Sequence, residues 1–283
     1  MSGLPNTTPV PGDPAVANAA PGAASVTRGR ARIMAVTSGK GGVGKTFLSA
    51  NLAAALSRRG ERVLVLDADL GLANLDVVLN LHPKITLHDV FTGKATLGEA
   101  ILPAPGGFEV LLAGSGLVEY SRLTAEVRDQ LLKIIETVAP RYDRILLDTG
   151  AGISDVVLYA VSLADEVLVV TTPEPTSMTD AYATIKLLAT QQQRHAIRLV
   201  VHHVGRPGEG RAIRGQLQLV VDRFVTPMLA PDAAPLKLDL LGEIPLDNSV
   251  REAVQRRRLL MELLPGCAAA LAVNALADRL MTA

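Results

Sequence analysis

The chain has 283 residues, 48% of them hydrophobic and 20% charged, which is enough apolar material for the core of one large α/β domain. Lys plus Arg and Asp plus Glu number 28 each, so no net positive charge favours direct nucleic-acid binding, and membrane contact is only weakly supported. The single cysteine, Cys267, excludes an internal disulfide, and no apolar run is long enough for a signal peptide or a membrane span. We therefore expect a cytoplasmic protein.

The predicted elements begin after a tail. Residues 1–29 are rich in Pro, Ala and Gly without apolar periodicity, so we expect them to be disordered and residues 30–283 to form one domain. The predicted strands are Ile33–Val36, Val63–Leu66, Val110–Leu112, Ile145–Leu147, Val167–Val170, Leu199–Val201 and Leu238–Leu241. The predicted helices are Leu48–Arg59, Glu126–Val138, Asp155–Leu163, Thr179–Gln191, Ile213–Phe224, Ser249–Arg258 and Ala268–Leu280. Unbroken apolar strands that alternate with helices predict a three-layer α/β fold, a mostly parallel sheet with helices on both faces.

The segment between the first strand and the first helix matches the phosphate-loop pattern G-x-x-x-x-G-K-[ST]. We expect it to bind ATP through Gly39, Lys40, Gly41, Gly42, Val43, Gly44, Lys45, Thr46 and the following Phe47. Glycines let successive backbone N–H groups point at phosphate oxygens, and the helix N-terminus adds partial positive charge. Lys45 is expected to neutralise the β- and γ-phosphates, and Thr46 to ligate Mg²⁺. A chance glycine-rich turn is the alternative, but the flanking strand and helix favour a P-loop NTPase domain.

A second lysine makes this loop unusual. Lys40 cannot easily reach the γ-phosphate that Lys45 already contacts. In a dimer it could reach the nucleotide of the other subunit and offset transition-state charge there, as an arginine finger does. A solvated loop lysine is the alternative reading.

Acidic residues follow two of the predicted strands, at the edge of the sheet where α/β proteins bind ligands. We expect Asp69 to orient the attacking water, Asp67 to lie near the Mg²⁺ shell, and Asp148 to hold Mg²⁺ directly or through water. Gly150 and Gly152 would let the following loop, switch II, move toward the γ-phosphate. A single acid of this kind is often only a helix cap. The predicted catalytic residues are Lys40, Lys45, Asp67 and Asp69.

These motifs resemble a known family. The segment Lys40–Thr46 resembles the deviant Walker A box of the MinD/ParA ATPases, and Asp67–Asp76 resembles the switch I of the MinD side of that group. Three further segments, Asp148–Ser154, Thr171–Tyr182 and Gly242–Asp247, are similar to the flagellar-number regulators of the FlhG/FleN family. The resemblance runs from about residue 32 to the end of the chain.

The resemblance implies a slow regulatory ATPase that forms a homodimer when it holds ATP. It implies control of flagellar number and placement through two partners, a flagellar transcription activator and the polar flagellar GTPase, with recruitment to the cell pole or inner membrane surface. A MinD/ParA-like ATPase that positions division or partitions DNA is the alternative. An ATP-dependent ligase or tyrosine kinase on the same scaffold is another, although residues 183–283 contain no tyrosine.

The sequence departs from the family at the adenine end of the site. Many relatives read adenine with an Asn after the sixth strand, where this chain has His202 and His203. His202 is therefore a candidate adenine contact, with a partner role toward the backbone as the alternative, and Pro245 and Asp247 are candidates on the other side. Membrane-binding relatives end in a basic amphipathic helix. Here residues 267–283 contain Arg279 as the only cation, which predicts a core-packing helix.

Overall fold

Eight strands form one sheet in the order β3-β4-β2-β5-β1-β6-β7-β8, and every neighbouring pair except β3 and β4 is parallel. The strands are β1 Arg32–Ser38, β2 Val63–Ala68, β3 Ile101–Pro103, β4 Glu109–Leu111, β5 Arg144–Ala151, β6 Glu166–Thr171, β7 Ala196–Val204 and β8 Lys237–Pro245. The computed structural model describes residues 1, 3, 30–71, 73–114 and 123–282. The predicted tail therefore lies almost entirely outside the described residues, as does Leu72 of the predicted switch I.

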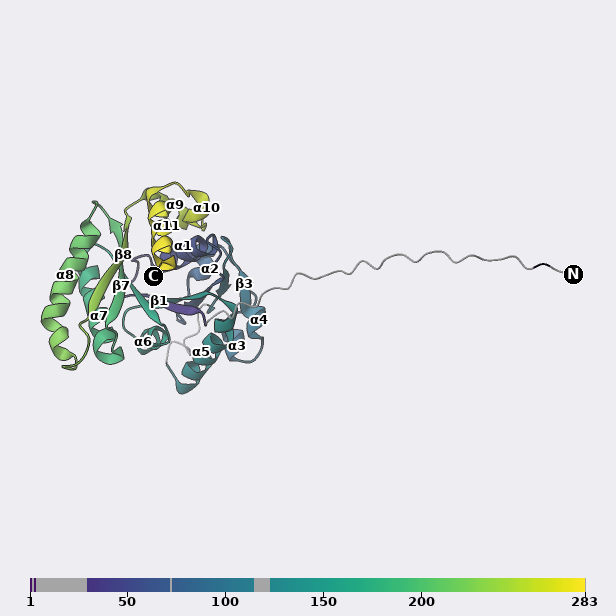
Figure 1. The fold of residues 1–283 in the computed structure, drawn as a ribbon, viewed down its shortest axis with the longest axis horizontal. Helices are drawn as coiled ribbons and strands as arrows, with labels where there is room; N and C mark the ends of the chain where they lie inside the picture. Colours follow the sequence, from purple (N-terminus) through teal and green to yellow (C-terminus); the bar gives the residue numbers. More distant parts are fainter. Residues whose placement is uncertain (2, 4–29, 72, 115–122, 283) are drawn as a thin grey trace.

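Helices cover both faces of this sheet (Figure 1). The longer ones are α1 Lys45–Ser57, α5 Ala125–Val138, α6 Asp155–Ser162, α7 Pro175–Gln192, α8 Glu209–Phe224, α9 Asn248–Gln255 and α11 Ala268–Met281. The short ones are α2 Leu75–Leu79, α3 Leu87–Phe91, α4 Leu97–Ala100 and α10 Leu260–Leu263. Two single 3₁₀ turns complete the described helices, Ala139–Arg141 and Thr226–Met228.

Each strand of the middle of the sheet contributes to two separate cores. In β1, Ile33 and Ala35 belong to the core that includes residues of α5, α6, α7 and α8, whereas Met34 and Val36 belong to the core that includes residues of α1, α10 and α11. Both faces of the strand are thus buried, which explains why its sequence is apolar throughout and not alternating. The predicted three-layer α/β fold is confirmed.

The last helix packs against the phosphate-loop helix. The buried side chains of α11 are Ala269, Ala270, Val273, Leu276, Ala277 and Leu280. Arg59, just after α1, donates to the backbone carbonyl of Asn274 at 3.1 Å and pairs with Asp278 at 2.7 Å. The prediction of a core-packing helix is confirmed. No helix in the described part of the chain is both long and apolar enough to cross a membrane.

Candidate nucleotide-binding site

The predicted phosphate loop connects β1 to α1 at the carboxyl edge of the sheet, with β5 and β6 on either side of β1. Gly44, the residue before α1, has φ of 97°, a left-handed conformation that favours glycine. Gly39 is required for a different reason. A β-carbon there would lie 2.1 Å from the backbone oxygen of Asp180, so the start of the loop rests directly on α7.

A cavity of about 600 Å³ opens above the loop. Its walls come from the loop, from the ends of β2, β5 and β7, and from α2, α6 and α9. The predicted site residues that line it are Gly41, Gly42, Gly44, Lys45, Thr46, Phe47, Asp69, Gly150 and His202. Those that do not are Gly39, Lys40, Val43, Asp67, Asp148, Gly152, Pro245 and Asp247. The structure therefore brings the predicted phosphate-binding residues to one cavity, and it places Lys40 outside that cavity.

Lys45 lies deep in this site. It is 8% exposed, and its amine donates to the hydroxyl of Ser38 at 2.9 Å. Burial lowers the pKa of Lys45, while the nearby carboxylates of Asp148 and Asp69 act in the opposite direction. The Lys45 side chain is thus held by the last residue of β1 and lies near two carboxylates.

Two buried carboxylates lie side by side at this edge, because Asp67 of β2 and Asp148 of β5 are register partners. Burial raises the pKa of Asp148 to about 6, against hydrogen bonds from Thr46 and from Ser49, the latter at 2.9 Å. Burial, and then the charge of Asp148, raise the pKa of Asp67. A divalent cation would offset this repulsion, and carboxylate and hydroxyl oxygens are the donors that Mg²⁺ prefers. The residues present therefore fit a Mg²⁺ site.

Asp69 extends from the end of β2 toward the predicted switch II. A β-carbon on Gly150 would lie 3.2 Å from the Asp69 carboxyl, so a larger residue there would push against the Asp69 side chain. The backbone N–H of Asp69 donates to Asp67 at 3.1 Å. Gly152, the other predicted switch glycine, has φ of 90°.

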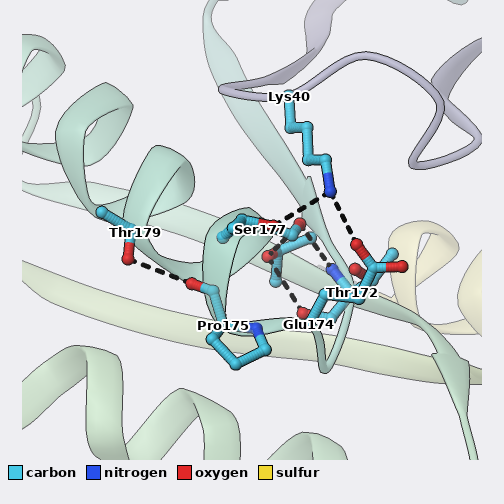
Figure 2. A network of polar contacts seen from close by, with 8 residues as sticks. Lys40, Thr172, Glu174, Pro175, Ser177 and Thr179 are labelled. Atoms are coloured by element: carbon cyan, nitrogen blue, oxygen red, sulfur yellow. Dashed lines mark hydrogen bonds and ion pairs between the residues drawn. The ribbon is translucent and has the colours of Figure 1, made fainter.

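The side chain of Lys40 points to the start of α7 (Figure 2), and Lys40 does not line the cavity. Its amine lies 2.6 Å from Glu174 Oε2 and 3.0 Å from Thr176 Oγ1. The hydrogen bond from Lys40 holds the pKa of Glu174 below its usual range. Nothing local in the sequence links Glu174 to a lysine 134 positions away.

His202 ends the site on the side of β7. It is 2% exposed, and its Nδ1 lies 2.7 Å from the backbone oxygen of Val43. Its ring stacks on Phe47 with centroids 5.7 Å apart and planes 2° apart. Burial lowers the pKa of His202 to about 4, so the ring is neutral at pH 7. Its Nε2 is buried without a hydrogen-bond partner among the described residues.

The other predicted adenine-side residues have different surroundings. The carboxylate of Asp247 accepts hydrogen bonds from the backbone of Ser249 at 2.9 Å and of Ala269 at 3.1 Å, so it caps α9 and α11. Pro245 ends β8. Sequence reasoning did not include Val250 and Val254 of α9, which line the cavity, because only the fold brings α9 against the loop.

Comparisons with known proteins agree with this geometry. A family model described as an AAA domain matches residues 31–200. The chain is 44% identical over 248 residues to the antiactivator FleN of Pseudomonas aeruginosa, covering 88% of this chain and 85% of that protein. It is 36% identical over 240 residues to the flagellum site-determining protein YlxH of Helicobacter pylori, covering 84% of this chain and 78% of that protein.

Solved structures extend the comparison to cell-division ATPases. The Pyrococcus furiosus cell division ATPase MinD superposes with a TM-score of 0.69 at 30% identity, covering 89% of this chain and 98% of that one. MinD of Pyrococcus horikoshii, solved with Mg-ADP, superposes with a TM-score of 0.71 at 28% identity, covering 88% of this chain and 96% of that one. The chain therefore belongs to the MinD/ParA-type deviant Walker A ATPases, close to the FlhG/FleN family, and is an ATPase.

Proposed function

We propose that this ATPase is a regulatory switch that dimerises with ATP bound and is reset by slow hydrolysis. The observation that carries the proposal is the position of Lys40. It belongs to the phosphate loop, yet its amine contacts Glu174 and Lys40 does not line the cavity, whereas Lys45 does. A loop cation that does not serve its own nucleotide is available for the nucleotide of a second subunit facing the same edge of the sheet.

The proposal gives the two lysines, Asp69 and the switch II glycines separate roles. Lys45 neutralises the β- and γ-phosphates, and Lys40 of the second subunit offsets the charge that develops during phosphoryl transfer. Asp69, which lies against Gly150, orients the attacking water. Switch II, with Gly150 and Gly152, responds to the γ-phosphate and reports its loss.

Mg²⁺ would be held by Thr46, with Asp148 and Asp67 around it directly or through water. No group of three or more His, Cys, Asp or Glu side chains is arranged to hold a metal among residues 30–71, 73–114 and 123–282. This agrees with Mg²⁺ chemistry, since the ion keeps several waters and takes ligands from the phosphates of its nucleotide. The ion would supply charge neutralisation at the β- and γ-phosphates.

His202 is proposed to read the base. Since the carbonyl of Val43 can only accept, Nδ1 carries the proton and the buried Nε2 of the neutral ring is an acceptor. An acceptor matches the exocyclic amino group of adenine and mismatches the carbonyl that guanine has at the same place. Pro245 and Asp247 would shape the opposite side, with Asp247 acting through the ends of α9 and α11.

The cellular role that we propose is control of flagellar number and placement. The support is the similarity to proteins named antiactivator FleN and flagellum site-determining protein YlxH. The partners would be a flagellar transcription activator and the polar flagellar GTPase, met at the cell pole or the inner membrane surface. Positioning of division or DNA is the second candidate, favoured by the similarity to MinD structures.

The decisive experiment measures mass by light scattering with and without ATP and Mg²⁺. We expect the wild type to dimerise with ATP, and Lys40→Ala to stay monomeric while its ATP affinity changes by less than about 3-fold, because Lys40 lies outside its own cavity. Lys133→Ala, an exposed lysine on α5, is the matched control and should dimerise normally. A dimer of Lys40→Ala with full ATP turnover would disprove the role in trans.

A further inference from the structure

A groove of about 640 Å³ lies away from the nucleotide cavity, along the edge strand β8 between α8 and α11. Arginines enter it from both walls, Arg211 and Arg214 from α8 and Arg279 from α11. In the described part of the chain none of the three forms an ion pair, and Arg211 makes no hydrogen bond either. Arg211 and Arg279 are exposed and Arg214 is half-buried, so all three guanidinium groups can be reached by a ligand from solvent.

Two of these arginines are held in place by the backbone of β8. Arg214 Nε donates to the carbonyl of Leu238 at 2.8 Å, and Arg279 Nη1 donates to the carbonyl of Leu241. Each guanidinium has five N–H donors, so each keeps most of them available after this contact. The anchoring reduces the entropy that would be lost when the groove takes a ligand.

The two carboxylates of the groove offset only part of this charge, and neither forms an ion pair with the three arginines. Glu243 accepts hydrogen bonds from the backbone N–H groups of Gly208 at 3.1 Å and Gly210 at 2.9 Å, so it is committed to the start of α8. Asp239 is exposed and lies in no ion pair with a described residue. Three arginines and two carboxylates line the groove, so its side chains carry a small excess of positive charge on a chain whose net charge is zero.

An added peptide strand is a poor candidate for the ligand. The amide of Gln218 donates to the carbonyl of Leu236 at 2.9 Å and accepts from the N–H of Leu238 at 2.9 Å, as a neighbouring strand would. With Arg214 also on Leu238, the edge backbone is already paired here, which blocks strand addition. A discrete anion can still use the remaining guanidinium donors.

We propose that this groove binds the phosphate group of a phosphorylated ligand at a second site, separate from the nucleotide cavity. Arginine forks match phosphate oxygens two at a time, and here three arginines line one groove from two helices. The cavity volume is in the range of small-molecule sites. Leu240 and Ala272 line the same groove and provide an apolar surface for the rest of the ligand. The proposal does not depend on the dimer switch, because no residue of the groove lines the nucleotide cavity.

Calorimetry with inorganic pyrophosphate tests the site, with the nucleotide cavity saturated by ADP and Mg²⁺. We expect binding to the wild type and an affinity about 10-fold lower for Arg211→Gln, because charge-assisted hydrogen bonds are lost. Arg211→Gln removes no contact with a described residue, so folding is not at risk. Arg223→Gln, on the same helix but outside the groove, is the control and should bind as the wild type does. ATP turnover should be equal in all three proteins.

A second measurement distinguishes the sources of the phosphate. Co-sedimentation with phosphatidylglycerol vesicles but not phosphatidylcholine vesicles, lost in Arg211→Gln, would identify a lipid headgroup. Pyrophosphate binding without co-sedimentation would identify a free phosphorylated compound. The proposal is overturned if the wild type binds neither probe, or if Arg223→Gln loses as much affinity as Arg211→Gln does. Both results would leave the ATPase proposal intact.

Discussion

The two lysines of the phosphate loop have opposite surroundings although five positions separate them. Lys45 is buried beside Asp148 and Asp69, whereas the side chain of Lys40 is 37% exposed and pairs with Glu174. Solvent-exposed ion pairs are individually weak, so the contact between Lys40 and Glu174 can open at small cost. This agrees with a lysine side chain that releases Glu174 and reaches the other subunit when a dimer forms.

Glu174→Gln removes the charge that holds Lys40 in its own subunit. In this variant no ion pair has to break before Lys40 reaches the other subunit. We therefore expect dimerisation at an ATP concentration about 2- to 5-fold lower than in the wild type. Light scattering across an ATP titration measures the midpoint, with Glu136→Gln on α5 as the control. A midpoint that stays the same or rises would show that Glu174 does not restrain Lys40.

His202 joins the β7 side of the cavity to the phosphate loop, through its contact with Val43. A β-carbon on Gly44 would lie 2.5 Å from the ring nitrogen of His202, so the loop glycine and this histidine fit each other. A charged imidazole would be unfavourable in this buried position, which is why its pKa lies near 4 and not at the ordinary 6.5.

This shift predicts a pH dependence of stability. Between pH 6.5 and 4 the unfolded chain binds a proton at His202 and the folded chain does not. The contribution of His202 to the free energy of unfolding is therefore fully present above pH 6.5 and is lost as the pH falls toward 4. His202→Asn keeps a donor for Val43 but cannot titrate. Between pH 7 and pH 4.5, the free energy of unfolding measured with urea should fall by about 2 to 3 kcal/mol more in the wild type than in His202→Asn. Asp148 and His203 titrate in both proteins and cancel in the difference. Parallel pH curves would contradict the assignment.

Helix α11 is held by a hydrogen bond from an arginine at the amino end of β5. Arg144, at the start of β5, is 2% exposed, pairs with Glu61 at 2.8 Å and donates to the carbonyl of Leu280 at 3.3 Å. One guanidinium therefore connects β5, the end of α11 and the segment after α1. Through α1 the stability of α11 is linked to the phosphate loop.

Arg144→Ala should lower the free energy of unfolding by about 3 kcal/mol, because it leaves a half-buried carboxylate and a buried carbonyl without their partner. Arg62→Ala is the matched control, since Arg62 pairs with Asp143 at the surface and should contribute less than about 1 kcal/mol. Urea unfolding measures both. Equal losses would mean that burial of the Arg144 pair does not determine its contribution.

The order of the strands places all elements of the ATPase site at one edge. Because β1 lies between β5 and β6, and β5 next to β2, the loop, Asp148 and Asp67 come together although they are far apart in the chain. The cavity opens on this edge, where Lys40 also lies. A second subunit docked here would cover the nucleotide and would at the same time bring its own nucleotide close to Lys40.

Asp69→Ala should separate assembly from hydrolysis. We expect ATP turnover to fall by at least about 100-fold, because the group that orients the water is missing, while the ATP-bound dimer persists. Phosphate release and light scattering on the same sample measure both properties. Turnover equal to that of the wild type would mean that another group orients the water.

Much of the fold could be predicted from local patterns. Strand and helix alternation predicted seven of the strands and the seven longer helices, because apolar periodicity is a property of neighbouring residues. The loop motif predicted Lys45 and Thr46 in the same way. Strand β3 and the short helices α2, α3, α4 and α10 were not predicted, because segments of three to five residues show little periodicity; β4, equally short, was recognised from its run of apolar residues.

Contacts between distant segments had to come from the three-dimensional arrangement. The amine of Lys40 meets Glu174 across 134 positions and His202 meets Val43 across 159, and no spacing rule connects such pairs. The three arginines of the β8 groove come from two helices on opposite sides of the sheet. The amino-acid sequence thus specifies the phosphate loop and the α/β class through short-range chemistry. The partner of Lys40, the neutral state of His202 and the groove depend on strand order and burial, which arise only when the chain packs.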